Sequence, residues 1–225
     1  MISVIIPTLN AEAGLPATLD RLSHGKPALL QEIIVSDGGS RDATIEIAER
    51  ANCRVFRCAP GRGEQLRYGA SLAKGRWLLF LHADTRLSTG WEAAVSDFVR
   101  RTAATHRAAS FTFELNDQTK RARLLERIVA LRVKALGLPY GDQGLLLSRS
   151  FYEEVGGFRP LPLMEDVDLV RRIGRARIET LPVSAVTSAD RYRRHGYIHR
   201  TARNAACLLL YFAGVPPRLI AGLYG

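Results

Sequence analysis

The sequence has few cysteines and no long apolar run. Its three cysteines, Cys53, Cys58 and Cys207, are odd in number and follow no secretory signal. That pattern argues against a disulfide framework and favours reduced thiols in the cytoplasm. No apolar stretch reaches the roughly 18 residues that a membrane-spanning helix needs. We therefore expect a cytoplasmic protein that does not cross a membrane unaided.

Signals of nucleic-acid binding and of a modular chain are also missing. The sequence has no RNA-binding aromatic motif, zinc-ligand spacing or recognition helix, so we expect no nucleic-acid partner. It has no internal repeat and no low-complexity linker, and its 225 residues suit one large domain. With 47% apolar residues the chain has enough hydrophobic side chains for a substantial core, which excludes a disordered protein.

Negative charge is scarce relative to positive charge. Thirty-two Lys and Arg stand against 22 Asp and Glu, which gives a formal net charge of +10. Such an excess favours polyanionic partners, such as nucleotide diphosphates or anionic lipid surfaces. Most of the basic side chains are Arg, which binds phosphate through a bidentate fork.

The N-terminal part of the chain alternates between two hydrophobic patterns. Short β-branched or apolar runs predict strands, and apolar residues at helical spacing between them predict helices. The predicted strands are residues 1–7, 32–36, 54–57 and 77–81. We expect the first helix to end at Gly25 and Pro27, and the third to follow the Gly61–Gly63 loop. This order is typical of βαβ units around a parallel sheet.

Two of these predicted strands end at an acid. The strand 32–36 continues into Asp37, and the apolar run 77–81 stops at His82 and Asp84. Ligands of open α/β sheets gather at the carboxyl ends of the strands. We therefore expect Asp37 to contact a base or ribose and Asp84 to hold a phosphate-bound metal ion. The alternative for Asp84 is that it only caps the turn and helix after its strand. For the loop after Asp37 the alternative is a strand-to-helix turn with Ser40 or Asp42 as N-cap.

The second part of the chain is predicted to hold a helix at 90–105, a strand at 110–115 and a basic helix, Lys120–Leu136. This last helix has an apolar stripe of Leu124, Ile128, Leu131 and Ala135, with Arg and Lys around it. Two interpretations stay open. Either the stripe packs into the core and the basic side is solvated, or the helix lies on an anionic membrane or a partner.

A further helix is predicted to begin near Met164. Glu165 and Asp166 fall in its first turn, where acids suit the helix dipole or present a general base to a cleft. The final segment, 191–225, is first basic and then apolar. It is too short and too broken to span a membrane, although it suits an interface.

The order of these motifs resembles the family 2 inverting glycosyltransferases with the GT-A fold, an α/β fold with a mostly parallel sheet flanked by helices. The motifs that carry the resemblance are VIIPTLN, VSDGGSRDAT, FLHADTRL, and GGF followed by MEDVDLVRR. The segments HADTRL, GDQGLLLSR and MEDVDL are similar to a short bacterial subgroup without transmembrane segments. The resemblance implies a glycosyltransferase domain over 1–190, with a nucleotide-binding half (1–88) and an acceptor half (89–190), followed by a helical tail (191–225).

The resemblance also implies how the donor is bound. Pro7, Thr8 and Leu9 match the loop that lines the nucleotide, and Asp37 matches the acid that hydrogen-bonds the base. Arg62 matches a basic contact to the nucleotide diphosphate. The tail contains a cluster of basic residues, Arg191, Arg193 and Arg194. We assign this cluster either to the diphosphate or to anionic lipid, and the alternative is a solvated basic loop.

The metal and the catalytic base follow from the same resemblance. Asp84 matches the last acid of the D-x-D element that holds Mg²⁺ or Mn²⁺ on the diphosphate, and Asp166 matches the catalytic base. His82 replaces the first acid of D-x-D, which weakens a hard-cation site. A later histidine, His195 or His199, is the candidate for a further ligand, and we assign His199. The residues assigned to the acceptor are Asp142, Gln143 and Glu165.

The predicted function is therefore metal-dependent, inverting transfer of a sugar from a nucleotide-diphosphate sugar. We expect a lipid or small-molecule acceptor at the inner face of the cell membrane, with peripheral contact to anionic lipid. Two alternatives stay open. One is a catalytically idle scaffold that binds nucleotide or a partner, which His82 motivates. The other is a nucleotidyltransferase, although the N-terminal loop lacks a Lys-bearing, Gly-rich phosphate signature.

Overall fold

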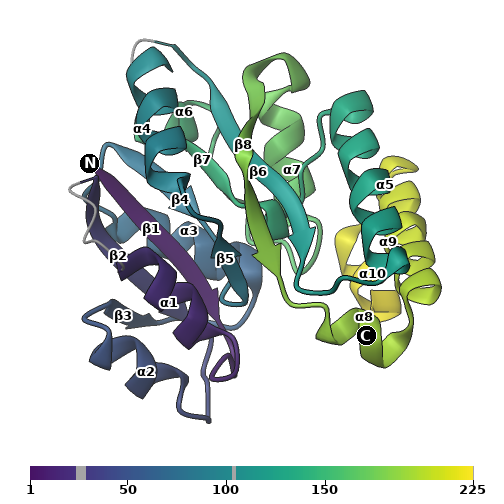
Figure 1. Ribbon diagram of the computed structural model, residues 1–225, viewed down its shortest axis with the longest axis horizontal. Coiled ribbons are helices and arrows are strands. Elements are labelled where there is room, and N and C mark those ends of the chain that lie inside the picture. Colours follow the sequence, from purple (N-terminus) through teal and green to yellow (C-terminus); the bar gives the residue numbers. More distant parts are fainter. Residues whose placement is uncertain (24–28, 103–104, 225) are drawn as a thin grey trace.

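Helices cover both faces of one sheet in the computed structural model, which describes residues 1–23, 29–102 and 105–224 (Figure 1). Within these residues the sheet has eight strands in the order β3-β2-β1-β4-β7-β6-β8-β5. One buried cluster packs α1, α2 and α4 on one face, and a second packs α3, α6 and α7 on the other. The architecture is the α/β class that the sequence predicted.

The N-terminal half consists of four parallel strands and the helices that connect them. The strands are β1 (Ile2–Thr8), β2 (Leu30–Asp37), β3 (Arg54–Arg57) and β4 (Trp77–Phe80). The helices are α1 (Leu15–Ser23), α2 (Thr44–Arg50) and α3 (Arg62–Leu72). Strands β1 and β4 are buried almost throughout, as expected for parallel strands covered on both faces. The predicted end of the first helix, at Gly25 and Pro27, lies outside the described residues.

The second half adds mixed strands to this sheet. Its elements are β5 (Thr85–Leu87), α4 (Trp91–Thr102), β6 (Ala108–Leu115), α5 (Lys120–Leu136), the 3₁₀ turn η1 (Gly141–Gln143), β7 (Leu145–Ser148), α6 (Arg149–Glu154), α7 (Glu165–Ile173), the 3₁₀ turn η2 (Arg175–Arg177) and β8 (Ile178–Thr187). Strand β7 runs antiparallel to both β4 and β6, and β8 runs parallel to β6. The predicted helix 90–105 ends earlier, at Thr102, and residues 103–104 are not described.

Strands β5 and β8 were not predicted from the sequence. Strand β8 contains Pro182, which lacks a backbone N–H and usually argues against a strand within a sheet. The structure accommodates it at an irregularity, because Phe111 of β6 faces Leu181 whereas Thr112 faces Ser184. Proline is tolerated where a bulge interrupts the ladder. Strand β5 is only three residues long and pairs with the end of β8.

Three C-terminal helices lie beside α5 at the end of the molecule away from β1–β3 (Figure 1). They are α8 (Asp190–His195), α9 (Tyr197–Phe212) and α10 (Pro217–Tyr224). Cys207 of α9 and Ile220 of α10 share a buried cluster with Val167 and Val170 of α7. The three cysteines are free thiols. In the part of the chain that the structure describes, none of the helices combines the length and apolarity that crossing a membrane requires.

The apolar stripe of α5 faces solvent. The helix buries Ala122, Leu125 and Val129 instead, whereas Leu124 and Leu131 are 59% and 65% exposed. The interpretation that the stripe packs into the core is therefore wrong. The reason is that α5 carries apolar residues on two faces, and helical periodicity does not determine which of the two packs against the sheet.

Candidate active site

A cavity of about 110 Å³ opens beyond the carboxyl end of β4, between η1, the first turn of α7 and helices α8 and α9. Segments far apart in the sequence bring acids and bases to it. The acids that line it are Asp84, Asp142, Glu165 and Asp166, and the basic side chains are Arg62, Arg191 and Arg200. The cavity thus lies at the sheet edge where ligands of α/β proteins gather.

Asp166 is held in place at the start of α7. One carboxylate oxygen, Oδ2, accepts a hydrogen bond of 2.7 Å from the backbone N–H of Gly141, and Oδ1 accepts one of 2.7 Å from Val167 N–H. A Cβ atom at Gly141 would come within 2.5 Å of His82 Nε2 and 3.5 Å of Asp166 Oδ2. Gly141 therefore leaves the space in which an imidazole and a carboxylate lie close together at the cavity wall.

Glu165 is buried beneath this position and forms an ion pair with the first residue of α3. Its Oε1 atom lies 3.4 Å from Arg62 Nη1, and only 2% of its side chain is exposed. Burial raises the pKa of Glu165 to about 7, with Arg62 acting in the opposite direction and Asp166 adding to the rise. The pair fixes α3 against α7 and presents the Arg62 guanidinium to the cavity.

Asp142 and His82 are less well satisfied. Burial raises the pKa of Asp142 to about 6; Arg132 opposes this rise, whereas Asp166 and Asp84 add to it. Burial also holds the pKa of His82 well below its usual value, and Arg62 and Arg191 lower it further, so the imidazole is neutral at pH 7. Asp142 Oδ1 and His82 Nε2 find no hydrogen-bond partner among the described residues.

These atoms give a partial fit to a divalent cation. Carboxylate oxygens are the ligands that Mg²⁺ and Mn²⁺ prefer, and the mutual repulsion of Asp84, Asp142 and Asp166 is what a cation would offset. Residues 1–23, 29–102 and 105–224 contain no group of three or more His, Cys, Asp or Glu arranged to hold a metal. A metal ion here would therefore need further oxygen ligands from the bound substrate.

Asp37, the last residue of β2, is not part of the lining of this cavity. Its side chain is fully buried, and its carboxylate accepts hydrogen bonds from Thr8 Oγ1 at 2.9 Å, Gly39 N–H at 2.9 Å and Ser40 N–H at 2.8 Å. Burial alone would raise the pKa of Asp37, but these donors and the Ser40 hydroxyl hold it below its usual value. Asp37 therefore fixes the loop that follows β2 against the end of β1.

The rest of the predicted nucleotide-binding segment lies at the end of β1, which includes Pro7 and Thr8, and continues into Leu9. Thr8 is buried, Pro7 is partly buried and Leu9 is 52% exposed. Gln65, which the sequence did not single out, donates from Nε2 to the carbonyl oxygens of Thr8 at 2.6 Å and Ser36 at 2.9 Å. It ties α3 to the ends of β1 and β2.

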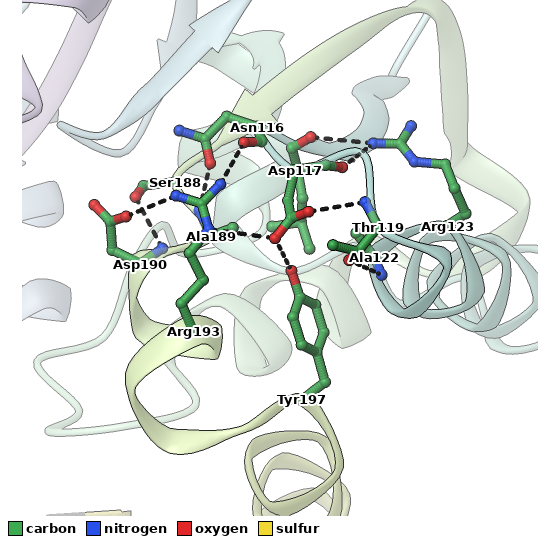
Figure 2. A network of polar contacts seen from close by, with 11 residues as sticks. Asn116, Asp117, Thr119, Ala122, Arg123, Ser188, Ala189, Asp190, Arg193 and Tyr197 are labelled. Carbon is green, nitrogen blue, oxygen red and sulfur yellow. Dashed lines mark hydrogen bonds and ion pairs between the residues drawn. The ribbon is translucent and has the colours of Figure 1, made fainter.

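The predicted cluster of basic residues divides on folding. Arg191 lines the cavity. Arg193 instead contacts Asp117, Asp190 and the carbonyl oxygen of Asn116 (Figure 2). The remaining two basic candidates, Arg194 and His199, are exposed, and the cavity lining described here does not include them.

Gln143 is buried away from this lining as well. Its Nε2 donates to Phe111 O at 3.1 Å, and its Oε1 accepts from Arg132 Nη2 at 3.3 Å. Sequence reasoning also missed Arg200, which lies over the Tyr192 ring at 5.3 Å and lines the cavity. Arg200 is 34 positions from Asp166 along the chain, and only the packing of α9 brings the two to one cavity.

Known sequences match mainly the N-terminal two thirds of the chain. Residues 3–155 match the family model described as Glycosyl transferase family 2. Over 101 residues the chain is 41% identical to a PGL/p-HBAD biosynthesis glycosyltransferase of Mycobacterium tuberculosis, covering 39% of this chain and 36% of that protein. It is 35% identical over 99 residues to a dolichyl-phosphate β-glucosyltransferase of Drosophila melanogaster, covering 37% and 30%. The matched part therefore spans about a third of each of these relatives.

Solved structures match over more of the chain. Glucosyl-3-phosphoglycerate synthase of M. tuberculosis, in complex with Mn²⁺, UDP and glucosyl-3-phosphoglycerate, has a TM-score of 0.61 at 22% identity and covers 96% of this chain and 81% of its own. Staphylococcus aureus TarS in complex with UDP has a TM-score of 0.64 at 18% identity and covers 88% and 64%. At these identities the similarity concerns the fold, and it confirms the predicted GT-A architecture.

Proposed function

Because this chain belongs to glycosyl transferase family 2 and is a glycosyltransferase, we propose that it moves a sugar from a UDP-linked donor onto an acceptor hydroxyl with inversion at the anomeric carbon. The observation that carries this proposal is the position of Asp166. Its carboxylate is fixed by two backbone N–H groups in a cavity that it shares with Arg62 and Arg191. The proposed base therefore shares the cavity with two guanidinium groups that would bind the departing diphosphate.

The donor would extend from the loop after β1 to this cavity. Thr8, with Pro7 and Leu9 on either side, would line the nucleotide. The carboxylate of Asp37, which accepts a hydrogen bond from Thr8, would hold this segment in place. The guanidinium groups of Arg62 and Arg191 would bind the diphosphate, since Arg forms paired hydrogen bonds with phosphate oxygens. UDP is the first nucleotide to test because two structures of similar fold were solved with it.

Asp84, with Asp142 beside it, would hold Mg²⁺ or Mn²⁺ together with diphosphate oxygens. Such an ion offsets the negative charge that develops on the departing diphosphate. Mn²⁺ is present in the complex of glucosyl-3-phosphoglycerate synthase. His199 does not enter this proposal because its side chain is exposed on α9.

Asp166 would act as the general base. The acceptor oxygen attacks the anomeric carbon, the bond from that carbon to the diphosphate oxygen breaks, and the hydroxyl proton moves to a carboxylate oxygen of Asp166. Hydrogen bonds from the backbone N–H groups of Gly141 and Val167 hold the carboxylate in a fixed position for this step. Neutral His82 forms the neighbouring wall without adding a charge.

The test is to measure UDP release and transfer with UDP-sugars and Mn²⁺ for the wild type and for Asp166→Asn. We expect the variant to lose about 100-fold or more of its turnover, because a positioned base contributes that much, while UDP affinity measured by calorimetry is unchanged. Turnover retained in Asp166→Asn would overturn its assignment as the base. Nucleotide binding without turnover in the wild type would favour the idle scaffold, and release of pyrophosphate in place of UDP would favour a nucleotidyltransferase.

The acceptor and the location of the protein are the less specific parts of this proposal. We predict that the acceptor is a lipid or a small molecule at the inner face of the cell membrane. We also predict that the protein is located in the cytoplasm.

A further inference from the structure

Two of the helices at the C-terminal end carry apolar residues that face solvent. On α5 the exposed stripe is the one noted above. On α9 the exposed apolar residues recur at helical spacing: Ile198, Ala202, Ala205, Leu209 and Phe212. Ile198 is 83% exposed and Leu209 is 70% exposed. We call these two stripes together the apolar face.

The apolar face consists of the parts of α5 and α9 that stay exposed after each helix has packed. Leu125 and Val129 of α5 are buried in a cluster that includes Tyr197 of α9, and Cys207 on the opposite side of α9 is buried against α7. Asp117 ties the same elements together, since its carboxylate accepts hydrogen bonds from Tyr197 OH at 2.8 Å and Thr119 N–H at 2.8 Å (Figure 2). The apolar residues are therefore exposed even though both helices are already packed against the rest of the fold. Exposed apolar surface of this extent marks an interaction site.

The segments that bear the apolar face are also the basic part of the molecule. Residues 120–136 and 191–225 together hold twelve Lys or Arg and a single acid, Glu126. They account for the whole positive excess of +10, so the rest of the chain is close to neutral. On α5, Lys120, Arg127 and Lys134 are exposed and recur every seven residues, directly beside the apolar stripe.

We propose that the apolar face is a docking surface for an anionic lipid bilayer. Apolar side chains flanked by basic ones suit the boundary between acyl chains and negatively charged headgroups. A second copy of this chain fits less well, because it would bring two strongly positive surfaces together. Helix α9 also contributes Arg200 and Asn204 to the cavity. The docking surface and the cavity therefore share this helix, and lipid binding itself does not depend on the proposed catalysis.

The test is flotation of the full chain with two kinds of vesicle at low and high salt. One kind is pure phosphatidylcholine, and the other contains about 30 mol% phosphatidylglycerol. We expect binding to the anionic vesicles that falls as salt rises, and much weaker binding to the neutral ones. Equal binding to both kinds, or to neither, would overturn the proposal.

Two variants separate the apolar from the electrostatic contribution. Leu131→Gln/Ile198→Gln/Leu209→Gln removes exposed apolar groups, and Arg121→Gln/Arg127→Gln removes two exposed charges of α5. We expect the charge variant to bind anionic vesicles about 30-fold more weakly. Each basic residue near an anionic surface contributes about 1 kcal/mol, and about 1.4 kcal/mol corresponds to a tenfold change in affinity. The apolar variant should bind at least as weakly.

The control variant is Arg50→Gln/Arg76→Gln, which removes the same charge from exposed positions outside these segments. It should bind nearly as the wild type does, and a loss equal to that of Arg121→Gln/Arg127→Gln would show that only net charge matters, which would overturn the docking surface. Light scattering gives an independent readout without lipid. A wild-type dimer that the apolar variant converts to a monomer would assign the face to a second copy instead.

Discussion

Asp37 and Asp142 lie at two regions of one sheet edge, and their carboxylates have opposite surroundings. At the end of β2, Asp37 accepts hydrogen bonds from Thr8, Gly39 and Ser40, and its pKa is held below the usual value. In the cavity beyond β4, Asp142 keeps an oxygen without a partner among the described residues, and its pKa is raised to about 6. The first region is complete without a ligand, whereas the second has polar groups that a bound substrate and cation would satisfy.

The same substitution at both acids should separate the two regions most strongly. Asp37→Asn places an amide NH₂ among donors and removes charge-assisted hydrogen bonds. We therefore expect the free energy of unfolding to fall by about 3 kcal/mol. Asp142→Asn removes a poorly solvated charge and should raise the free energy of unfolding by about 2 kcal/mol near pH 7. Urea denaturation of the two variants measures both values. Equal losses would contradict the contrast.

A second difference is the dependence of stability on pH. The pKa of Asp142 is about 6 in the folded state against a usual value of 3.8, so the folded protein holds this proton more tightly than the unfolded chain. Its contribution to stability is therefore fully present at low pH and is lost as pH rises from about 4 to about 6. Asp37 has a lowered pKa, and its contribution is instead lost as pH falls.

We accordingly expect Asp142→Asn to match the wild type near pH 4 and to exceed its stability by about 2 kcal/mol near pH 7. Asp37→Asn should show the opposite trend, with its deficit largest at neutral pH. Urea denaturation at several pH values, without metal or nucleotide, gives both curves. A constant difference between Asp142→Asn and the wild type across this range would show that Asp142 does not have the raised pKa.

The contrast between the two regions also explains what the sequence could predict. In the N-terminal half β1 and β4 are apolar and almost fully buried, so hydrophobic pattern and structure agree there. In the second half local signals conflict with tertiary structure. Pro182 sits in a strand because a bulge accommodates it, and α5 has two apolar faces of which only the less obvious one is buried. Pattern alone does not resolve either case.

The candidate site was predictable to a similar extent. Asp84 and Asp166 follow from motifs, since each lies at a fixed place in a strand–loop or loop–helix unit. Arg200 and Gln65 do not, because nothing in their local sequence distinguishes them from other helical polar residues. The roles of the tail arginines depend on which side of α8 faces the cavity. Arg191 lines the cavity, whereas Arg193, two positions later, does not.

Arg191 and Arg193 give the smallest of the expected effects and the finest test of this contrast. Arg191 lines the cavity, whereas Arg193 Nη2 donates to Asn116 O at 2.8 Å in the network that attaches α8 to the end of β6 (Figure 2). We expect Arg191→Ala to weaken UDP binding about tenfold with little change in melting temperature, because it removes a phosphate contact. Arg193→Ala should leave UDP affinity unchanged and lower the melting temperature by about 3 °C.

Calorimetric titration with UDP and Mn²⁺, together with thermal unfolding of the same samples, measures both properties of both variants. Arg194→Ala is the matched control, since its side chain is exposed outside the cavity lining and should change neither property. If Arg193→Ala weakened UDP binding as much as Arg191→Ala, both arginines would act on the diphosphate, which is one of the roles that the sequence suggested for this cluster. If only Arg191→Ala does so, the division of the cluster by α8 determines which arginine binds the donor.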